Sequence, residues 1–227
     1  MGKRVLDYVE ILVALFEENR NAKNAISMDK YMRNQFPFIG MKTPKRRELM
    51  RQFYQETEIL KEPLQPDFVL ALWKKDEREF QNAALDYLDR MNKKLSKEHL
   101  PLMETLITTK SWWDTVDTLA TKSVGKIAKE QPEVVAETIE GWAYCDVLWL
   151  QRTAILFQLK YKEHTDEKLL YRYILHHATS NEFFIQKAIG WALREYSKTN
   201  PESVKYFIRN NELAKLSIRE GMKHIRH

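Results

Sequence analysis

Hydrophobic residues recur with a helical period along most of the chain, and the same pattern returns every 35 residues. Four twenty-residue segments align without gaps, and their first residues, at positions 76, 111, 146 and 181, are each 35 apart. Each first residue is of a type that caps helix N-termini, because its short polar side chain can accept a bond from the first helical amides. Small or apolar residues follow in shared columns. The pattern predicts helices that begin near the first residues of Asp76–Leu95, Ser111–Glu130, Asp146–Thr165 and Asn181–Asn200.

Shorter stretches with the same period lie between and before these segments. They predict further helices over Leu100–Thr109, Pro132–Tyr144, Glu167–Ala178 and Pro201–Glu212, and, near the N-terminus, over Arg4–Asn19, Asp29–Gln35 and Pro44–Glu56. The repeating unit is therefore helix, turn, helix. Because such a unit cannot bury an apolar face alone, we expect the units to stack into a curved solenoid with a concave surface. One domain spanning residues 1–227 is expected.

The scarcity of glycine and proline supports an all-α fold. The chain has 6 glycines and 7 prolines, 13 of 227 residues, which is about half of the average usage of ~12%. Pro132 and Pro201 bound 68 residues that contain only two glycines. Few residues that interrupt helices predict long helices.

Cysteine and histidine usage restricts the chemistry. Cys145 is the only cysteine, so no disulfide can form within the chain and no cysteine-based metal site exists. The six histidines never take the i, i+4 spacing of paired ligands on a helix, and no metal or cofactor is expected. The chain shows no apolar signal core and no window near the ~18 apolar residues of a membrane span, so we expect an intracellular, cytoplasmic protein. Its net charge of +5 is compatible with a polyanionic partner.

One column of the repeat carries polar and charged residues. Seven residues into each copy, with one position 35 residues upstream added, stand Arg47, Asn82, Asp117, Arg152 and Lys187. Equivalent positions of a solenoid line up along one surface, so this column predicts a basic-polar stripe with a single acid. Trp113 lies four residues before Asp117 and Trp191 four after Lys187, on the same helix faces. Cations, one carboxylate and two tryptophans together favour a groove that binds nucleic acid.

Each part of this groove also has an ordinary structural interpretation. Tryptophans at helical spacing are more often core residues than ligand platforms, and Trp73, Trp112, Trp142 and Trp149 are assigned to the core or to packing between helices. A polar column can be only the solvated face of a helix. Asp117 could simply pair with Arg152, and Asp114 is interpreted as a first-turn acid favoured by the helix dipole.

A single carboxylate beside aromatic rings suits one reaction in particular. Cleavage of a glycosidic bond passes through an oxocarbenium-like state that a carboxylate stabilises. Alkylation of a purine at a ring nitrogen makes the base cationic, and hence already a good leaving group. No second carboxyl group is then needed to protonate it. Tryptophan faces also favour cationic groups, and arginine or lysine would bind the flanking phosphates.

Four stretches are similar to the AlkD family of bacterial alkylpurine DNA glycosylases, which are built from HEAT-like repeats. They are YMRNQFPFIGMKTPKRR from Tyr31, TKSWWDTVD from Thr109, WLQRTAILFQLKYK from Trp149 and EFFIQKAIGWALREYSKTNP from Glu182, and the similarity spans nearly the whole chain. The resemblance implies a monomer that releases bases of the 3-methyladenine and 7-methylguanine type from double-stranded DNA, leaving an abasic site, with no metal or cofactor. It also implies capture of the damaged nucleotide without a deep base-flipping pocket.

The resemblance assigns roles to individual residues. The catalytic acid falls on Asp117, the aromatic residues that contact the lesion on Trp113 and Trp191, and the phosphate-binding arginine on Arg152. The matching segments further imply DNA-backbone contacts at Tyr31, Thr43, Arg47 and Lys187. The competing class is a helical-repeat module without activity, either a damage-binding protein or an interaction scaffold. An acid at position 117 argues against a pure DNA binder, because it would cost affinity for anionic DNA.

Overall fold

The computed structural model describes residues 5–225, and this range contains helices and no strand. The predicted all-α fold is therefore confirmed. The helices separate into two compact units, Met1–Leu95 and Ser96–His227. The expectations of one domain and of a solenoid shape stay predictions. Within residues 5–225, none of the helices is both long and apolar enough to cross a membrane.

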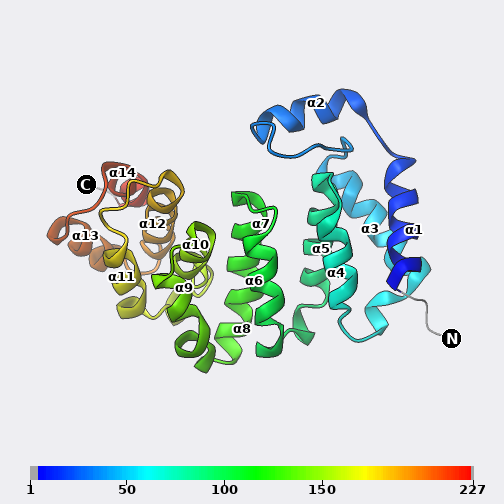
Figure 1. The fold of residues 1–227 in the computed structure, drawn as a ribbon. Helices are drawn as coiled ribbons and strands as arrows, with labels where there is room; N and C mark the ends of the chain where they lie inside the picture. The colour runs from blue at the N-terminus through cyan, green and yellow to red at the C-terminus, as the bar shows by residue number, and fades with distance from the viewer. Residues whose placement is uncertain (1–4, 226–227) are drawn as a thin grey trace. The chain divides into compact units, whose positions relative to one another are not determined.

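The first unit is held together by aromatic packing. Phe16 stacks on Phe80 at a ring-centroid distance of 5.4 Å, and Phe53 stacks on Phe68 at 5.7 Å. These rings come from helices that contact one another in the blue-to-cyan part of Figure 1. The unit comprises α1 (Val5–Glu17), α2 (Ala22–Tyr31), α3 (Thr43–Thr57), α4 (Pro66–Lys74) and α5 (Arg78–Arg90), with a short 3₁₀ turn at Ile59–Lys61.

The second unit buries an aliphatic core between its last helices. Ile155, Ile185, Ile189, Leu193 and Val204 are all at most 1% exposed there. Figure 1 shows the elements in green to red. They are α6 (Leu100–Thr108), α7 (Trp113–Thr118), a π-helical segment (Leu119–Val124), α8 (Gly125–Glu130), a second π-helical segment (Val135–Ile139), α9 (Glu140–Tyr144), α10 (Leu148–Leu156), α11 (Glu167–His176), α12 (Phe183–Tyr196), α13 (Pro201–Asn210) and α14 (Lys215–Gly221).

The four repeat helices begin where the sequence pattern places them, but their caps differ from the prediction. Helices α5, α7, α10 and α12 start at residues 78, 113, 148 and 183, which keeps the spacing of 35. The N-cap is in each case one residue later than predicted, and its side chain makes no capping hydrogen bond. The hydroxyl of Ser111 instead donates to the carbonyl of Ile107 at 2.6 Å, at the end of the preceding helix. Asp76, Ser111, Asp146 and Asn181 are therefore not the N-caps.

A recurring glutamine secures the loop before three of these helices. The side-chain amides of Gln81, Gln151 and Gln186 occupy one column of the repeat, and each donates to a carbonyl six residues earlier. The acceptors are Lys75, Cys145 and Ser180, at 2.7, 2.6 and 2.9 Å. These bonds give partners to carbonyls of the loop between two helices, which have no helical amide to accept from. The sequence pattern contained this column, but its role was not predicted.

The helix predicted over Asp29–Gln35 is wrong. Helix α2 begins earlier, at Ala22, because the side chain of Asn21 accepts from the amide of Asn24 and caps it. The chain then leaves the helix through Arg33 and Asn34, whose φ angles of 55° and 54° are left-handed. Two consecutive left-handed residues cannot continue an α-helix.

Candidate active site

Asp117 lies at the point where an α-helix changes to a π-helix. Helix α7 passes directly into the π-helical segment Leu119–Val124 and then into α8, with helical backbone angles at both junctions. The hydroxyl of Thr121 donates to the carbonyl of Asp117 at 2.7 Å. π-helical turns are rare inside α-helices and are frequent at functional sites. Asp117 therefore lies beside one of the two π-helical segments that the described residues contain.

Arg152 holds the carboxylate of Asp117 through both of its oxygens. The guanidinium Nε donates to Oδ1 at 2.8 Å, and Nη2 donates to Oδ2 at 2.9 Å. A third nitrogen, Nη1, donates to the carbonyl of Phe184. The side chains of Arg152 and Asp117 are 6% and 14% exposed, so water screens this pair weakly. The structure thus shows the pairing that the sequence left open as an ordinary interpretation, and the geometry is the strong, two-bond form.

Burial and Arg152 shift the pKa of Asp117 in opposite directions. Burial raises the pKa of the Asp117 carboxyl above its ordinary value, while the two hydrogen bonds and the charge of Arg152 oppose the rise. The charge of Asp114 raises the pKa a little further. Both oxygens accept from the guanidinium, which the ionised form does best, and each keeps a lone pair for another donor.

Three aromatic side chains pack against one another, and one of them also lies close to Arg152. The rings of Trp112, Trp149 and Phe184 lie 4.9 to 6.0 Å apart between centroids. Arg152 lies over the Phe184 ring at 6.0 Å. Trp112 and Trp149 thus pack between helices as predicted, and Trp73 and Trp142 are buried. Phe184 was not predicted to contribute, although it stands 35 residues after Trp149 in the same column.

The predicted lesion-contacting tryptophans lie on the two helices that flank α10. Trp113 is the first residue of α7, four positions before Asp117, and is half-buried. Trp191 lies on α12, is also half-buried, and packs against the core of the second unit. Helix α10 contacts both α7 and α12. The structure therefore leaves part of each indole open to solvent.

Lys187 is engaged by an acid that the sequence analysis did not consider. Its Nζ lies 3.1 Å from the carboxylate of Glu220, which also contacts Arg194 at 3.2 Å and Lys223 at 2.7 Å. The hydrogen bond from Lys223 and those of the neighbouring cations hold the pKa of Glu220 at about 2, although burial opposes this. Gly190 allows the approach, because a Cβ there would lie 2.5 Å from the Cβ of Glu220.

The three remaining predicted DNA contacts belong to the first unit. Tyr31 ends α2 and is 71% exposed. Thr43 begins α3, and Arg47 follows one turn later; both are exposed. The structure therefore makes all three accessible to a ligand.

A buried glutamate fixes the loop that precedes α3. The carboxylate of Glu79 accepts hydrogen bonds from the amides of Ile39, Gly40 and Met41 at 2.8 to 3.0 Å. Gly40 has a φ of 99°, and a Cβ there would lie 2.0 Å from the carbonyl oxygen of Asn21. The segment FPFIGM around Gly40, which belongs to the family resemblance, therefore has a structural role. The resemblance itself gave Glu79 no role.

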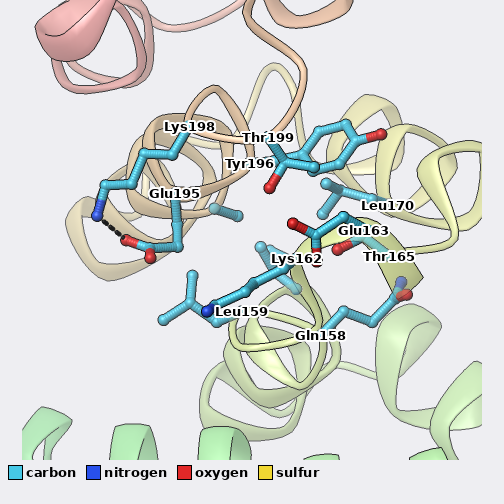
Figure 2. A pocket seen from close by; sticks show the side chains of 12 residues that line it. Gln158, Leu159, Lys162, Glu163, Thr165, Leu170, Glu195, Tyr196, Lys198 and Thr199 are labelled. Atoms are coloured by element: carbon cyan, nitrogen blue, oxygen red, sulfur yellow. Dashed lines mark hydrogen bonds and ion pairs between the residues drawn. The ribbon is translucent and has the colours of Figure 1, made fainter.

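A cavity of about 250 Å³ lies beyond the end of α10. Figure 2 shows charged side chains of Lys162, Glu163, Glu195 and Lys198 at this cavity, with Lys198 bonded to Glu195 at 2.6 Å. The aliphatic part of its lining is formed by Ile155, Leu159, Leu170 and Ala192. Among the described residues that line it, Asp117, Arg152, Trp113 and Trp191 do not occur. This cavity is therefore not built around the candidate acid.

The sequence matches the pattern of the DNA alkylation repair enzyme family over residues 12–225, nearly the whole chain. The chain belongs to this family. A protein of Enterococcus faecalis described as a predicted DNA alkylation repair enzyme is 34% identical, over 91% of this chain and 96% of its own, with a TM-score of 0.81. The chain is therefore an enzyme of DNA alkylation repair, and the resemblance seen in the sequence is confirmed.

A more distant structure agrees on the fold. AlkD2 from Streptococcus mutans is 18% identical, over 82% of this chain and 92% of its own, with a TM-score of 0.59. At this identity the likeness supports the helical fold alone. Among curated proteins, no match to the chain is found.

Proposed function

We propose that this DNA alkylation repair enzyme is a DNA glycosylase that hydrolyses the N-glycosidic bond of cationic alkylated purines in duplex DNA. The bases concerned are of the 3-methyladenine and 7-methylguanine type, and the product is an abasic site. The observation that carries the proposal is the largely buried carboxylate of Asp117, held through both oxygens by Arg152 at 2.8 and 2.9 Å.

The reaction needs only one acidic residue when the base is already cationic. The bond between C1′ and the base nitrogen breaks, and its electron pair leaves with the base, which becomes neutral. Water bonds to C1′ as the oxocarbenium-like sugar forms, and a proton of that water passes to the Asp117 carboxylate and then to solvent. Atoms and charge balance without a second carboxyl group.

Arg152 keeps Asp117 in the state that this step requires. Burial alone would favour the neutral acid, which could neither stabilise positive charge nor accept a proton. The guanidinium occupies one edge of the carboxylate and leaves one lone pair on each oxygen for water and sugar. It also fixes the carboxylate before the lesion binds, which is how preorganised groups lower a reaction barrier. On this proposal Arg152 positions the acid in addition to any contact with phosphate.

The expected contribution can be bounded. A carboxylate ~4 Å from a unit positive charge, at an effective dielectric of ~20, contributes roughly 4 kcal/mol. Because Arg152 reduces that attraction, Asp117 lowers the reaction barrier by at most ~3–4 kcal/mol, which corresponds to about two to three orders of magnitude in rate. The half-buried faces of Trp113 and Trp191 would add ~0.5–2 kcal/mol each towards a cationic base or sugar.

One observation favours a second interpretation of Asp117, in which its role is purely structural. A buried carboxylate engaged by an arginine is also what a purely structural ion pair looks like. In that case Asp117 stabilises the contact between α7 and α10 and takes no part in chemistry. The two interpretations predict different behaviour when only the charge at position 117 is removed.

Asp117→Asn decides between them, because it keeps the size of the side chain and removes its negative charge. We expect release of free 7-methylguanine from a lesion-containing duplex to fall by roughly two to three orders of magnitude. Affinity for the duplex should be unchanged or slightly higher, since an acid facing DNA is gone. The measurement is single-turnover release of the base, with binding measured in parallel.

The matched control is Asp114→Asn, which removes one negative charge from the same helix. It should excise within about threefold of the parent, with thermal unfolding of both variants as a check on folding. If Asp117→Asn were as active as the control, the catalytic role of Asp117 would be refuted and its purely structural role would stand.

A further inference from the structure

The first unit contains a polar cavity between two helices that contact each other. It has a volume of about 340 Å³ and lies between α3 and α5. Arg47, Arg51 and Tyr54 of α3 line it at spacings of four and three residues, so they share one face of the helix. Asp86, Asp89 and Arg90 of α5 complete the polar lining, with Met50 as its apolar part.

The side chains that line this cavity carry a net positive charge. Arg47, Arg51 and Arg90 line it together with two acids. One of these acids, Asp86, is already paired with Arg46 at 2.8 Å, and both of these side chains are largely buried. Because Arg46 neutralises Asp86, the three arginines that line the cavity face one remaining carboxylate, that of Asp89, which leaves an excess of two positive charges. Guanidinium groups present planar pairs of donors that match the oxygens of phosphate.

A buried hydroxyl at the same cavity lacks a hydrogen-bond partner. Tyr54 is 9% exposed, and its Oη has no partner among the described residues. Buried hydroxyl groups in folded proteins are almost always bonded, so such a group needs an explanation. Burial raises the pKa of this hydroxyl far above its ordinary value, and it therefore stays protonated as a donor. An oxyanion in the cavity would accept from it.

We propose that the cavity between α3 and α5 is a phosphate-binding site, in which Arg51 and Arg90 bind the anion and the Tyr54 hydroxyl donates to it. Its volume is about ten times the ~30 Å³ share of one water molecule, so a tetrahedral oxyanion fits together with waters. Among the residues that line this cavity, the resemblance implied a DNA contact only for Arg47, and the structure adds Arg51, Arg90 and Tyr54. The phosphate group can come from the backbone of bound DNA or from free phosphate.

The test uses the full chain and measures no excision, so it is independent of the glycosylase proposal. In the first arm, inorganic phosphate is titrated at low salt while the Nε resonances of the arginines are followed by NMR. Those of Arg51 and Arg90 should shift and saturate. Arg51→Gln or Arg90→Gln should weaken phosphate binding about tenfold, and Tyr54→Phe, which removes only the hydroxyl, about fivefold.

The second arm identifies the source of the phosphate. Binding to an undamaged duplex is measured against salt, and each lost arginine contact should lower the slope of log affinity on log salt by about one. The control is Arg20→Gln, an arginine of the same unit that pairs with Glu17 and Glu77 instead. A lowered slope indicates backbone phosphate; an unchanged slope with weakened phosphate binding indicates free phosphate. If neither arm distinguishes the variants from the control, the site does not exist.

Discussion

A carboxylate as buried as that of Asp117 stays ionised only if a cation lies against it. Arg152 is that cation, and its guanidinium is in turn fixed by the carbonyl of Phe184. Sequence reasoning reached Asp117 and Arg152 because they stand 35 residues apart in one column. It could not reach Phe184 or Glu220. A backbone carbonyl as acceptor leaves no mark on residue identity, and Glu220 lies outside the four aligned segments.

The pH dependence of excision tests how Arg152 acts on Asp117. Because the step needs the carboxylate, the rate should rise with pH through the raised pKa of Asp117 and level off above it. In Arg152→Gln the opposing influence of the guanidinium is lost, so that pKa rises further and the acidic limb moves to higher pH. The measurement is single-turnover excision from pH 4 to 9, on a lesion stable over that range, at ~0.1 M salt.

Arg172→Gln is the matched control for this profile. Arg172 pairs with Glu140 on the surface of the second unit, with 54% of its side chain exposed. Its loss should leave the acidic limb in place. An acidic limb that stays fixed in Arg152→Gln as well would mean that Asp117 is not the titrating group.

At the scale of the elements, hydrophobic periodicity predicted where the repeat helices lie but not how they end. Their starts follow the spacing of 35. The predicted caps at Ser111 and its equivalents do not form, because the residue after each one is extended and is itself the N-cap. Periodicity also says nothing about π-helical turns, which insert a residue while the apolar face continues. The wrong helix at Asp29–Gln35 has a related cause, since capping by Asn21 and two left-handed residues outweigh a short apolar pattern.

Substitution of two glycines separates the effect of close packing on stability from the effect of helix propensity. A Cβ at Gly125 would lie 2.4 Å from the carbonyl oxygen of Phe157, whereas a Cβ at Gly141 would meet nothing within 4 Å. Gly125→Ala should therefore lower the free energy of unfolding by about 1–3 kcal/mol through overpacking. Gly141→Ala should raise it by ~0.5–1 kcal/mol, because alanine favours a helix. Urea unfolding of both variants measures the difference, and an equal change in the two would contradict the packing argument.

At the scale of the whole molecule, the net charge of +5 indicates only that binding of an anionic partner is favoured. The structure shows that many of the cations already have partners: Lys187 lies against Glu220, and Arg152 against Asp117. Affinity for DNA therefore depends on which cations can also reach phosphate, and composition cannot report this. The sequence also did not indicate the two compact units, because the repeat continues through the boundary between them.

Lys187 and Lys223 allow a controlled test of which cations contact DNA. Both contact the carboxylate of Glu220, at 3.1 and 2.7 Å, so removal of either leaves that acid with one cation fewer. Only Lys187 is predicted to bind a phosphate. Lys187→Ala should therefore weaken binding to damaged and undamaged duplexes equally and lower the salt slope by about one, because one fewer counterion is released. Lys223→Ala should weaken binding less and leave the slope unchanged. Equal slopes in the two variants would show that Lys187 acts through the charge of Glu220 and not through a phosphate contact.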